Sequence, residues 1–191
     1  GICWLRVGSG RLSLWHRPGG KACAKLRAIA GATSLLTLLH EREGAQNIGQ
    51  QAQAAGLEWL WAPLDGANAE YLESEEAAAS LLDATVGAVQ MLRAGGSVLV
   101  HCSAGIHRTG TVGYAVLRVS GWSEEEARNG LEQMRAVTAA RVDVHGAGRS
   151  SGGARTAIAE RLVVAAALKA LNELHMVGEG VSDTRVEKAS E

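Results

Sequence analysis

Residues 97–110 read SVLVHCSAGIHRTG, and the fold that we expect follows from this segment. Its first part, Ser97 to His101, is a short β-branched run of the kind found in the middle of a parallel sheet. Its last part leads into an apolar segment, Thr109 to Ser120, with the pattern of a helix. A buried strand that passes directly into a helix places the connecting loop at the carboxyl edge of the sheet, where α/β proteins bind their ligands.

Strands and helices alternate on both sides of this stretch. The pattern predicts further strands at Arg11–Trp15, Ala32–Leu39 and Leu57–Leu64, and helices at Lys21–Ala30, Glu41–Ala55, Glu70–Ala94, Glu124–Ala136 and Ala154–Leu174. We therefore expect an α/β fold with a central, mainly parallel sheet of about four or five strands flanked by helices. Residues 1–176 are expected to form a single domain, and the polar residues 177–191 a flexible tail.

The composition excludes several classes of function. Nineteen Lys and Arg against twenty Asp and Glu give a formal charge of -1, so no overall field attracts nucleic acid or an anionic membrane. The three cysteines, at positions 3, 23 and 102, form neither a disulfide framework nor a paired metal site, and no apolar run has the length of a membrane span. We expect a cytoplasmic monomer without metal or cofactor, in which the five tryptophans anchor the core or its rim. Cys3 and Cys23 are expected to be packing residues, with a disulfide to an oxidised Cys102 as the alternative.

The loop between the central strand and its helix has the residues that a tetrahedral anion requires. If its backbone amides point inward, they form a nest for such an anion at the N-terminus of the helix. Gly105 lets the turn close. The expected phosphate-binding residues are Ser103, Ala104, Gly105, Ile106, His107 and Arg108.

Four side chains of this segment have expected chemical roles. Cys102 is the expected nucleophile, because inward amides and the helix dipole stabilise a thiolate. Arg108 can hold two phosphate oxygens with its planar fork, as lysine could not. Thr109 is expected to hydrogen-bond the sulfur and ease its departure, and His101 to orient the loop from behind. The alternative is an ordinary strand-to-helix turn with an inert cysteine. In that case the presence of Gly105, Arg108 and Thr109 in the same segment would be a coincidence.

Residues 101–110 resemble the signature loop of the protein tyrosine and dual-specificity phosphatase superfamily. Residues 121–127, GWSEEEA, are similar to the stretch that opens the next helix in small dual-specificity members, and Arg11 to Pro18 resembles their N-terminal strand. The resemblance implies hydrolysis of phosphate esters without a metal, through a phosphocysteine at Cys102, with Arg108 and Thr109 in their family roles. It also implies a phosphorylated protein as substrate: phosphotyrosine, together with phosphoserine and phosphothreonine if the cleft is shallow.

Such a mechanism also needs a general acid. Expelling the alkoxide of a phosphate ester requires a proton, which the family supplies from an aspartate on an upstream loop. Residues 59–68, WLWAPLDGAN, resemble that loop and make Asp65 the candidate. The common family pattern has one more residue between the proline and the aspartate, so Glu70 and Glu73 stay open as alternatives. An ordinary turn aspartate is the other interpretation of Asp65.

The sequence leaves the substrate open. His107 stands where the family often has a small residue, and its imidazole would attract a further anionic group, unless it is a solvated side chain without a role. Arg149 and Arg155 flank a loop rich in Gly and Ser and would add a phosphate contact, unless that loop is only a solvated turn. The competing functions are hydrolysis of an inositol phosphate, a phosphoinositide or an RNA phosphate, and a pseudo-phosphatase that binds phosphorylated partners without turnover.

Overall fold

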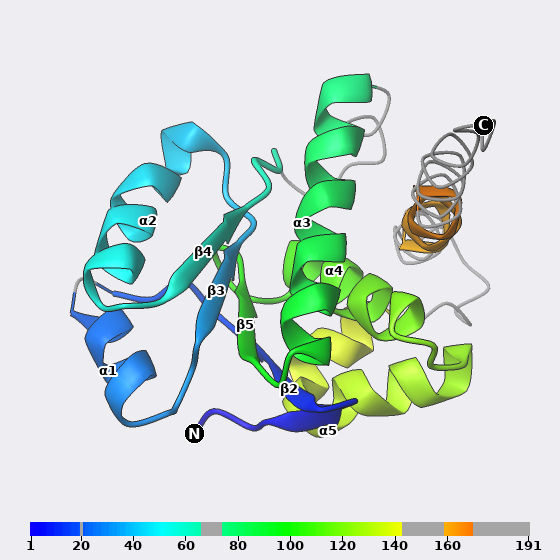
Figure 1. Cartoon of the computed structure of the whole chain (residues 1–191), viewed down its shortest axis with the longest axis horizontal. Helices are drawn as coiled ribbons and strands as arrows, with labels where there is room; N and C mark the ends of the chain where they lie inside the picture. Colours follow the sequence, from blue (N-terminus) through cyan, green and yellow to red (C-terminus); the bar gives the residue numbers. More distant parts are fainter. Residues whose placement is uncertain (20, 66–73, 143–158, 170–191) are drawn as a thin grey trace, which may run out of the picture.

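A five-stranded sheet forms the centre of the computed structural model, which describes residues 1–19, 21–65, 74–142 and 159–169 (Figure 1). Its strands, in the spatial order β1-β2-β5-β3-β4, are β1 (Leu5–Val7), β2 (Gly10–Trp15), β3 (Ser34–Thr37), β4 (Glu58–Trp61) and β5 (Ser97–His101). β2, β5, β3 and β4 pair in parallel, and only β1 is antiparallel to its neighbour in this sheet. The predicted mainly parallel sheet is confirmed.

Helices cover both faces of the sheet (Figure 1). On one face lie α1 (Ala22–Ala28) and α2 (Ala45–Ala54), and on the other α3 (Glu75–Arg93), α4 (His107–Val119) and α5 (Glu124–Val142). A further helical segment spans 159–169. Ser74 caps α3, since its hydroxyl accepts a hydrogen bond from the Ala77 amide. The acidic residues Glu75 and Glu76 in the first turn complement the helix dipole.

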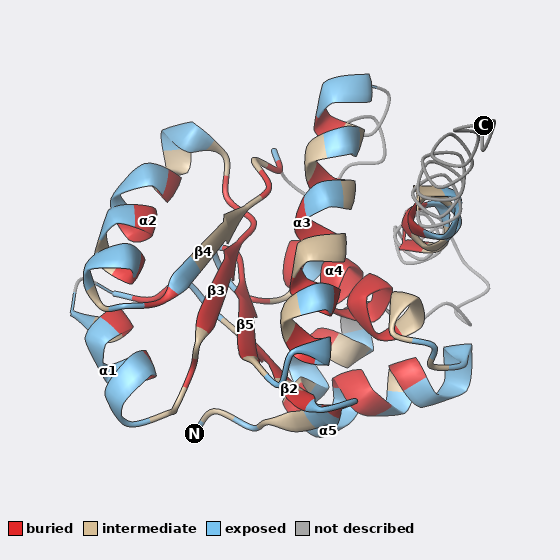
Figure 2. Cartoon of the chain, in the orientation of Figure 1, coloured by how far each residue is buried: buried red, intermediate tan, exposed pale blue. Residues whose placement is uncertain are grey.

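The central strand is buried along its whole length. All five residues of β5 are buried, and the apolar residues of β3 and of the inward helix faces pack around them (Figure 2). All five tryptophans lie against this core, which confirms their predicted role. A strand held on both edges and both faces gives the residue that follows it, Cys102, a fixed position.

Two helices differ from the sequence prediction. Instead of one helix over Glu41–Ala55, a 3-10 turn (Glu41–Glu43) is separated from α2 by Gly44 at φ 81°, because the side chain of His40 caps the turn and Glu43 bonds back to the His40 amide. The helix predicted to end at Ala136 continues to Val142 across a non-helical residue, Arg135.

Other sequence expectations have mixed outcomes. Strand β1 was not foreseen, since three residues carry too little pattern. Cys23 is buried as expected, but Cys3 is exposed, so its prediction as a packing residue is wrong. Within the described ranges, no helix is long and apolar enough to cross a bilayer. Outside the described residues lie Glu70, Glu73, the Gly- and Ser-rich loop with Arg149 and Arg155, and the tail at 177–191.

Candidate active site

The loop between β5 and α4 is held by its carbonyl groups. Each backbone carbonyl from residue 102 to residue 107 accepts a hydrogen bond. The donors are His101 Nδ1 to Cys102 (3.3 Å), the Arg17 amide to Ser103 (3.0 Å), Arg135 Nη1 to Ala104 (3.1 Å) and Gly105 (2.5 Å), Thr138 Oγ1 to Gly105 (2.8 Å), the Gly110 amide to Ile106 (2.9 Å) and Thr111 Oγ1 to His107 (3.1 Å).

This arrangement fixes where the amides point. In a trans peptide the carbonyl of one residue and the amide of the next point in opposite directions. Carbonyls held from behind therefore turn the amides of residues 103–108 toward the centre of the loop. Those of residues 103–106 donate to no acceptor among the described residues, so they are available to an anion.

Gly105 is required where it stands. Its φ of 69° lies in the left-handed region, and a Cβ atom there would come within 2.1 Å of the Trp15 carbonyl oxygen. The neighbouring donors, Arg135 and Thr138, come from α5, and the non-helical backbone at Arg135 coincides with its two bonds to the loop. Glycine therefore lets the loop pass between β2 and α5.

Arg108 is oriented by a carboxylate that the sequence analysis missed. Its Nη1 and Nη2 donate to the two oxygens of Glu43 at 2.5 and 2.9 Å, and Nη1 also donates to the Leu64 carbonyl at 2.8 Å. These bonds use three of the five guanidinium hydrogens. The other two, on Nε and Nη2, lie side by side along one edge and form a fork that can hold two phosphate oxygens.

Electrostatics keep this fork charged. Burial acts to lower the pKa of Arg108, but the hydrogen bonds to Glu43 and the charge of Cys102 outweigh burial and raise it. The bond to Arg108 lowers the pKa of Glu43 in turn. The cation is therefore permanent, and Glu43 fixes its direction without using the edge that a phosphate needs.

Cys102 and Thr109 lie buried beside this fork. Cys102 is 3% exposed at the end of β5. Thr109 is fully buried, and its hydroxyl has no hydrogen-bond partner within the described part of the chain. The predicted bond from Thr109 to the Cys102 sulfur is thus not formed in this structure. A buried hydroxyl without a partner is unfavourable, and it is suited to donate once a stronger acceptor forms nearby.

His101 contacts the loop at the Cys102 carbonyl. Its ring is fully buried, with Nε2 2.9 Å from the Thr37 hydroxyl and Nδ1 facing the Cys102 carbonyl. Burial lowers the pKa of His101 to about 4. The imidazole is therefore neutral at physiological pH.

Asp65 is next in sequence to a residue that contacts Arg108. It follows Leu64, whose carbonyl is bonded to Arg108, so the backbone of this loop lies against the catalytic loop. The Asp65 carboxylate pairs with Nη2 of Arg42, and both side chains are largely exposed. Exposed pairs of this kind contribute about 1 kcal/mol or less, so Asp65 can exchange this partner for a substrate.

Residues 21–172 match the model of a tyrosine phosphatase family. The chain belongs to this family. It is a cysteine-dependent phosphatase, and the resemblance of residues 101–110 to that superfamily is confirmed. No curated protein sequence is similar enough to the chain to match it.

Solved structures of phosphatases share the fold. PTPMT1 in complex with PI(5)P has 21% identity and a TM-score of 0.60, covering 85% of this chain and 98% of its own. Kinase-associated phosphatase with its catalytic cysteine replaced by serine has 18% identity and a TM-score of 0.57, covering 75% and 92%. TpbA of P. aeruginosa has 20% identity and a TM-score of 0.51, covering 87% and 91%. At these identities the likeness shows the fold of the phosphatase.

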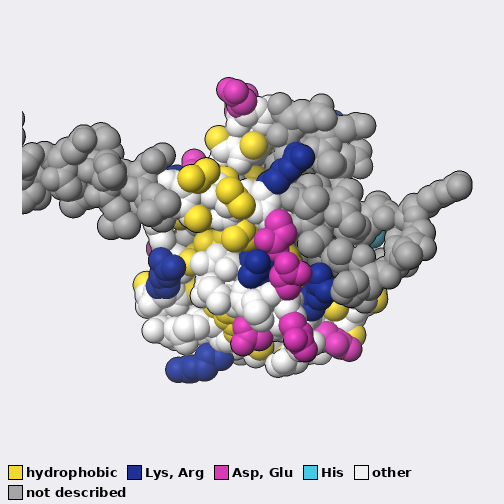
Figure 3. Space-filling view, turned by 90° about the vertical axis from the view of Figure 1, so that its right-hand side faces the viewer, with side chains coloured by type: hydrophobic (Ala, Val, Ile, Leu, Met, Phe, Trp, Pro, Cys, Tyr) yellow, Lys and Arg dark blue, Asp and Glu magenta, His cyan; other side chains and the backbone are white. Residues whose placement is uncertain are grey.

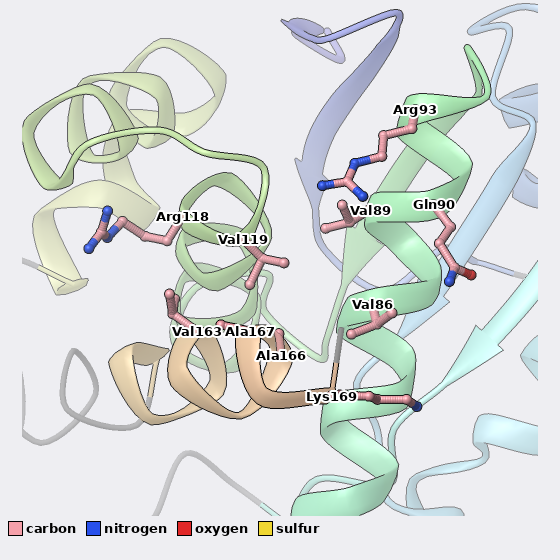
Figure 4. A pocket seen from close by; sticks show the side chains of 10 residues that line it. All are labelled: Val86, Val89, Gln90, Arg93, Arg118, Val119, Val163, Ala166, Ala167 and Lys169. Carbon is pink, nitrogen blue, oxygen red and sulfur yellow. The ribbon is translucent and has the colours of Figure 1, made fainter. Parts of the chain in front are cut away.

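Two further observations concern the rest of the phosphatase. Among the described residues, no group of three or more His, Cys, Asp or Glu side chains could hold a metal ion. A cavity of about 370 Å³ lies between α3, α4 and the helix at 159–169, lined by valines, alanines, Gln90 and three basic side chains (Figure 4). Two of these bases, Arg118 and Lys169, pair with Glu160 and Asp83, and the face bearing this helix mixes charges of both signs with apolar side chains (Figure 3). The described residues that line the cavity include no carboxylate, hydroxyl, thiol or imidazole.

Proposed function

We propose that the protein removes phosphate from phosphorylated proteins through a phosphocysteine at Cys102. Phosphotyrosine is the principal substrate, and phosphoserine and phosphothreonine are also accepted. The observation that carries this proposal is the loop geometry: every carbonyl from residue 102 to residue 107 is bonded, the amides face inward, and the free edge of Arg108 completes the site. Such donors neutralise the charge of a phosphoryl group as it transfers.

In the first step the Cys102 sulfur attacks phosphorus in line with the leaving oxygen. The S–P bond forms and the P–O bond to the substrate breaks. Asp65, protonated, gives its proton to the leaving oxygen, so the product departs as a neutral alcohol or phenol. Arg108 and the loop amides hold the other phosphate oxygens throughout.

In the second step water attacks the phosphorus of the phosphocysteine. Asp65, now a carboxylate, accepts a proton from that water, and the S–P bond breaks to release inorganic phosphate. Sulfur then carries the developing negative charge. The Thr109 hydroxyl, which has no partner within the described residues, donates to this sulfur and eases its departure.

The exposure of the loop supports a protein substrate. Ser103, Ala104 and His107 are exposed, whereas Cys102 is buried just beneath them. A phosphate can therefore reach the Cys102 sulfur without being carried on a side chain as long as that of tyrosine, so phosphoserine and phosphothreonine also fit. His107 is also exposed, and we expect it to contact the substrate around the phosphate.

The chemical proposal is tested with two aryl phosphates that differ in leaving group. Cys102→Ser should abolish turnover of both. Asp65→Asn should lower kcat/KM, which reports the first step, by about 100-fold for the ester of an alkyl-substituted phenol, whose leaving oxygen needs a proton, but by less than about fivefold for the ester of p-nitrophenol, whose leaving oxygen does not. An equal loss for both esters would remove Asp65 from the role of acid. An inactive wild type that still binds vanadate would make the protein a pseudo-phosphatase.

The substrate is tested by comparing kcat/KM for a phosphotyrosyl peptide, a phosphoseryl peptide and a soluble short-chain phosphatidylinositol phosphate. We expect the phosphotyrosyl peptide to exceed the lipid headgroup by tenfold or more. The reverse order would place the protein among phosphatases of non-protein substrates and overturn the protein assignment. The Cys102→Ser variant serves as the blank for each compound.

A further inference from the structure

A chain of hydrogen bonds, two of them buried and one partly buried, crosses the sheet and ends at the backbone of Cys102. Trp59 on β4 donates its indole N–H to the Thr37 hydroxyl on β3 at 2.9 Å. The same hydroxyl lies 2.9 Å from Nε2 of His101 on β5, and Nδ1 of His101 lies 3.3 Å from the Cys102 carbonyl. The three side chains share one face of the sheet, because β3 pairs in register with both β4 and β5.

The direction of each bond follows from what its groups can do. A carbonyl oxygen only accepts, so Nδ1 of His101 must carry the hydrogen. The buried imidazole is neutral, which leaves Nε2 as an acceptor. Thr37 must therefore donate to Nε2. Its oxygen still has lone pairs, and one of them accepts from Trp59, whose indole can only donate.

We propose that Thr37 and Trp59 are positioning residues for the phosphatase reaction, which lock His101 in its Nδ1–H form and thereby hold the first peptide of the catalytic loop. That peptide joins the Cys102 carbonyl to the Ser103 amide. With the carbonyl held by His101, the Ser103 amide is turned toward the sulfur and the phosphate. A rotated peptide would instead aim a carbonyl dipole at the incoming dianion.

The packing around Trp59 supports this role. A Cβ atom on Gly49 of α2 would come within 2.6 Å of the Trp59 ring, so the helix rests directly on the indole. The Trp59 and Trp61 rings stack at 5.7 Å. The indole is thus fixed from two sides with its N–H on Thr37. Trp61 itself donates to the Leu39 carbonyl, which is not part of the chain of bonds.

The test compares matched variants. Thr37→Val keeps the shape and removes the hydroxyl, and Thr37→Ser keeps the hydroxyl. We expect Thr37→Val to lower kcat for an aryl phosphate by about tenfold to a hundredfold, since a small displacement of catalytic groups has effects of this size. Thr37→Ser should stay within about threefold of wild type. Trp59→Phe should show a smaller loss than Thr37→Val. Trp61→Phe keeps an aromatic ring beside Trp59 and loses only an indole bond outside the chain, so it should show no loss.

A spectroscopic measurement separates positioning from general destabilisation. In protein labelled with ¹⁵N-histidine, two-bond ¹⁵N–¹H spectra distinguish Nδ1–H from Nε2–H, and comparison with His101→Asn assigns the signal. We expect Nδ1–H in wild type and Thr37→Ser, and a mixture of both forms in Thr37→Val. The same spectra of Trp59→Phe give the answer if Thr37→Val does not fold.

The outcomes decide the proposal. Wild-type kcat together with an unchanged His101 tautomer in Thr37→Val would overturn it, as would an equal loss in Trp61→Phe. The inference rests on the proposed role of Cys102 as nucleophile, but the measurement of the His101 tautomer does not depend on that role. An inactive wild type whose His101 tautomer still depends on Thr37 would count against the proposed function alone.

Discussion

This fold should lose stability at mildly acidic pH, still above the range in which its carboxylates titrate, because His101 is buried in its neutral form. Burial lowers its pKa to about 4, whereas histidine in an unfolded chain has a pKa of about 6.5. Between these values the unfolded chain binds a proton that the folded chain does not. The stabilising contribution is therefore complete above pH 6.5 and is lost as pH falls toward 4.

The size of the effect follows from the two pKa values. One unit of difference corresponds to about 1.4 kcal/mol, so the full contribution is about 3 kcal/mol. Between pH 7.5 and pH 5.0, about 2 kcal/mol of this should be lost. Bonds to Arg108 and Arg118 lower the pKa values of Glu43 and Glu160, so these carboxylates keep their charge in that interval.

The assay is urea unfolding of wild type and His101→Asn at pH 7.5 and pH 5.0. The asparagine does not titrate, and its amide is placed to donate to the Cys102 carbonyl. We expect the free energy of unfolding of wild type to fall by about 2 kcal/mol more than that of the variant. An equal fall in both proteins would show that the acid sensitivity does not come from His101.

Three substitutions probe the supports of the loop. Glu43→Gln removes the charge that orients Arg108 and should lower kcat by about tenfold to a hundredfold, as expected for a charged hydrogen bond; an unchanged kcat would show that Arg108 orients itself. The free energy of unfolding in urea should fall by about 1 kcal/mol or more further for Gly105→Ala than for Gly56→Ala. Both glycines have a left-handed φ, but only at Gly105 would an added Cβ atom clash with other atoms. Equal losses would contradict this clash. Thr138→Val should reduce stability by about 1 kcal/mol and raise KM for an aryl phosphate, while an unaffected KM would limit Thr138 to a structural role.

The strand and helix at the catalytic loop were predictable because their signals are local. The β-branched run before Cys102 and the apolar period after it lie next to each other in the sequence, and β5 has the predicted bounds, Ser97–His101. The same holds for Gly105, whose left-handed conformation is a property of one residue. Local sterics and burial fix these features before any distant contact forms.

Glu43 and the α5 donors could not be found in this way. Glu43 lies 65 positions before Arg108, inside a stretch that reads as one continuous helix, and its direction depends on the cap that His40 provides. Arg135 lies within a helix that the composition predicts as regular, yet its backbone departs from helical geometry where it bonds the loop. Contacts between distant segments override local propensity at these positions.

Short-range pattern and residue chemistry suffice to predict the parallel sheet around β5, the loop that carries Cys102 and Arg108, and the family to which they point. The groups that hold that loop depend on the three-dimensional arrangement of the chain: the carboxylate on Arg108, the α5 donors on its carbonyls, and the bonds from Trp59 through Thr37 to His101. These partners come from separate strands and helices, and hydrogen bonds depend on distance and angle in space, which sequence spacing does not encode.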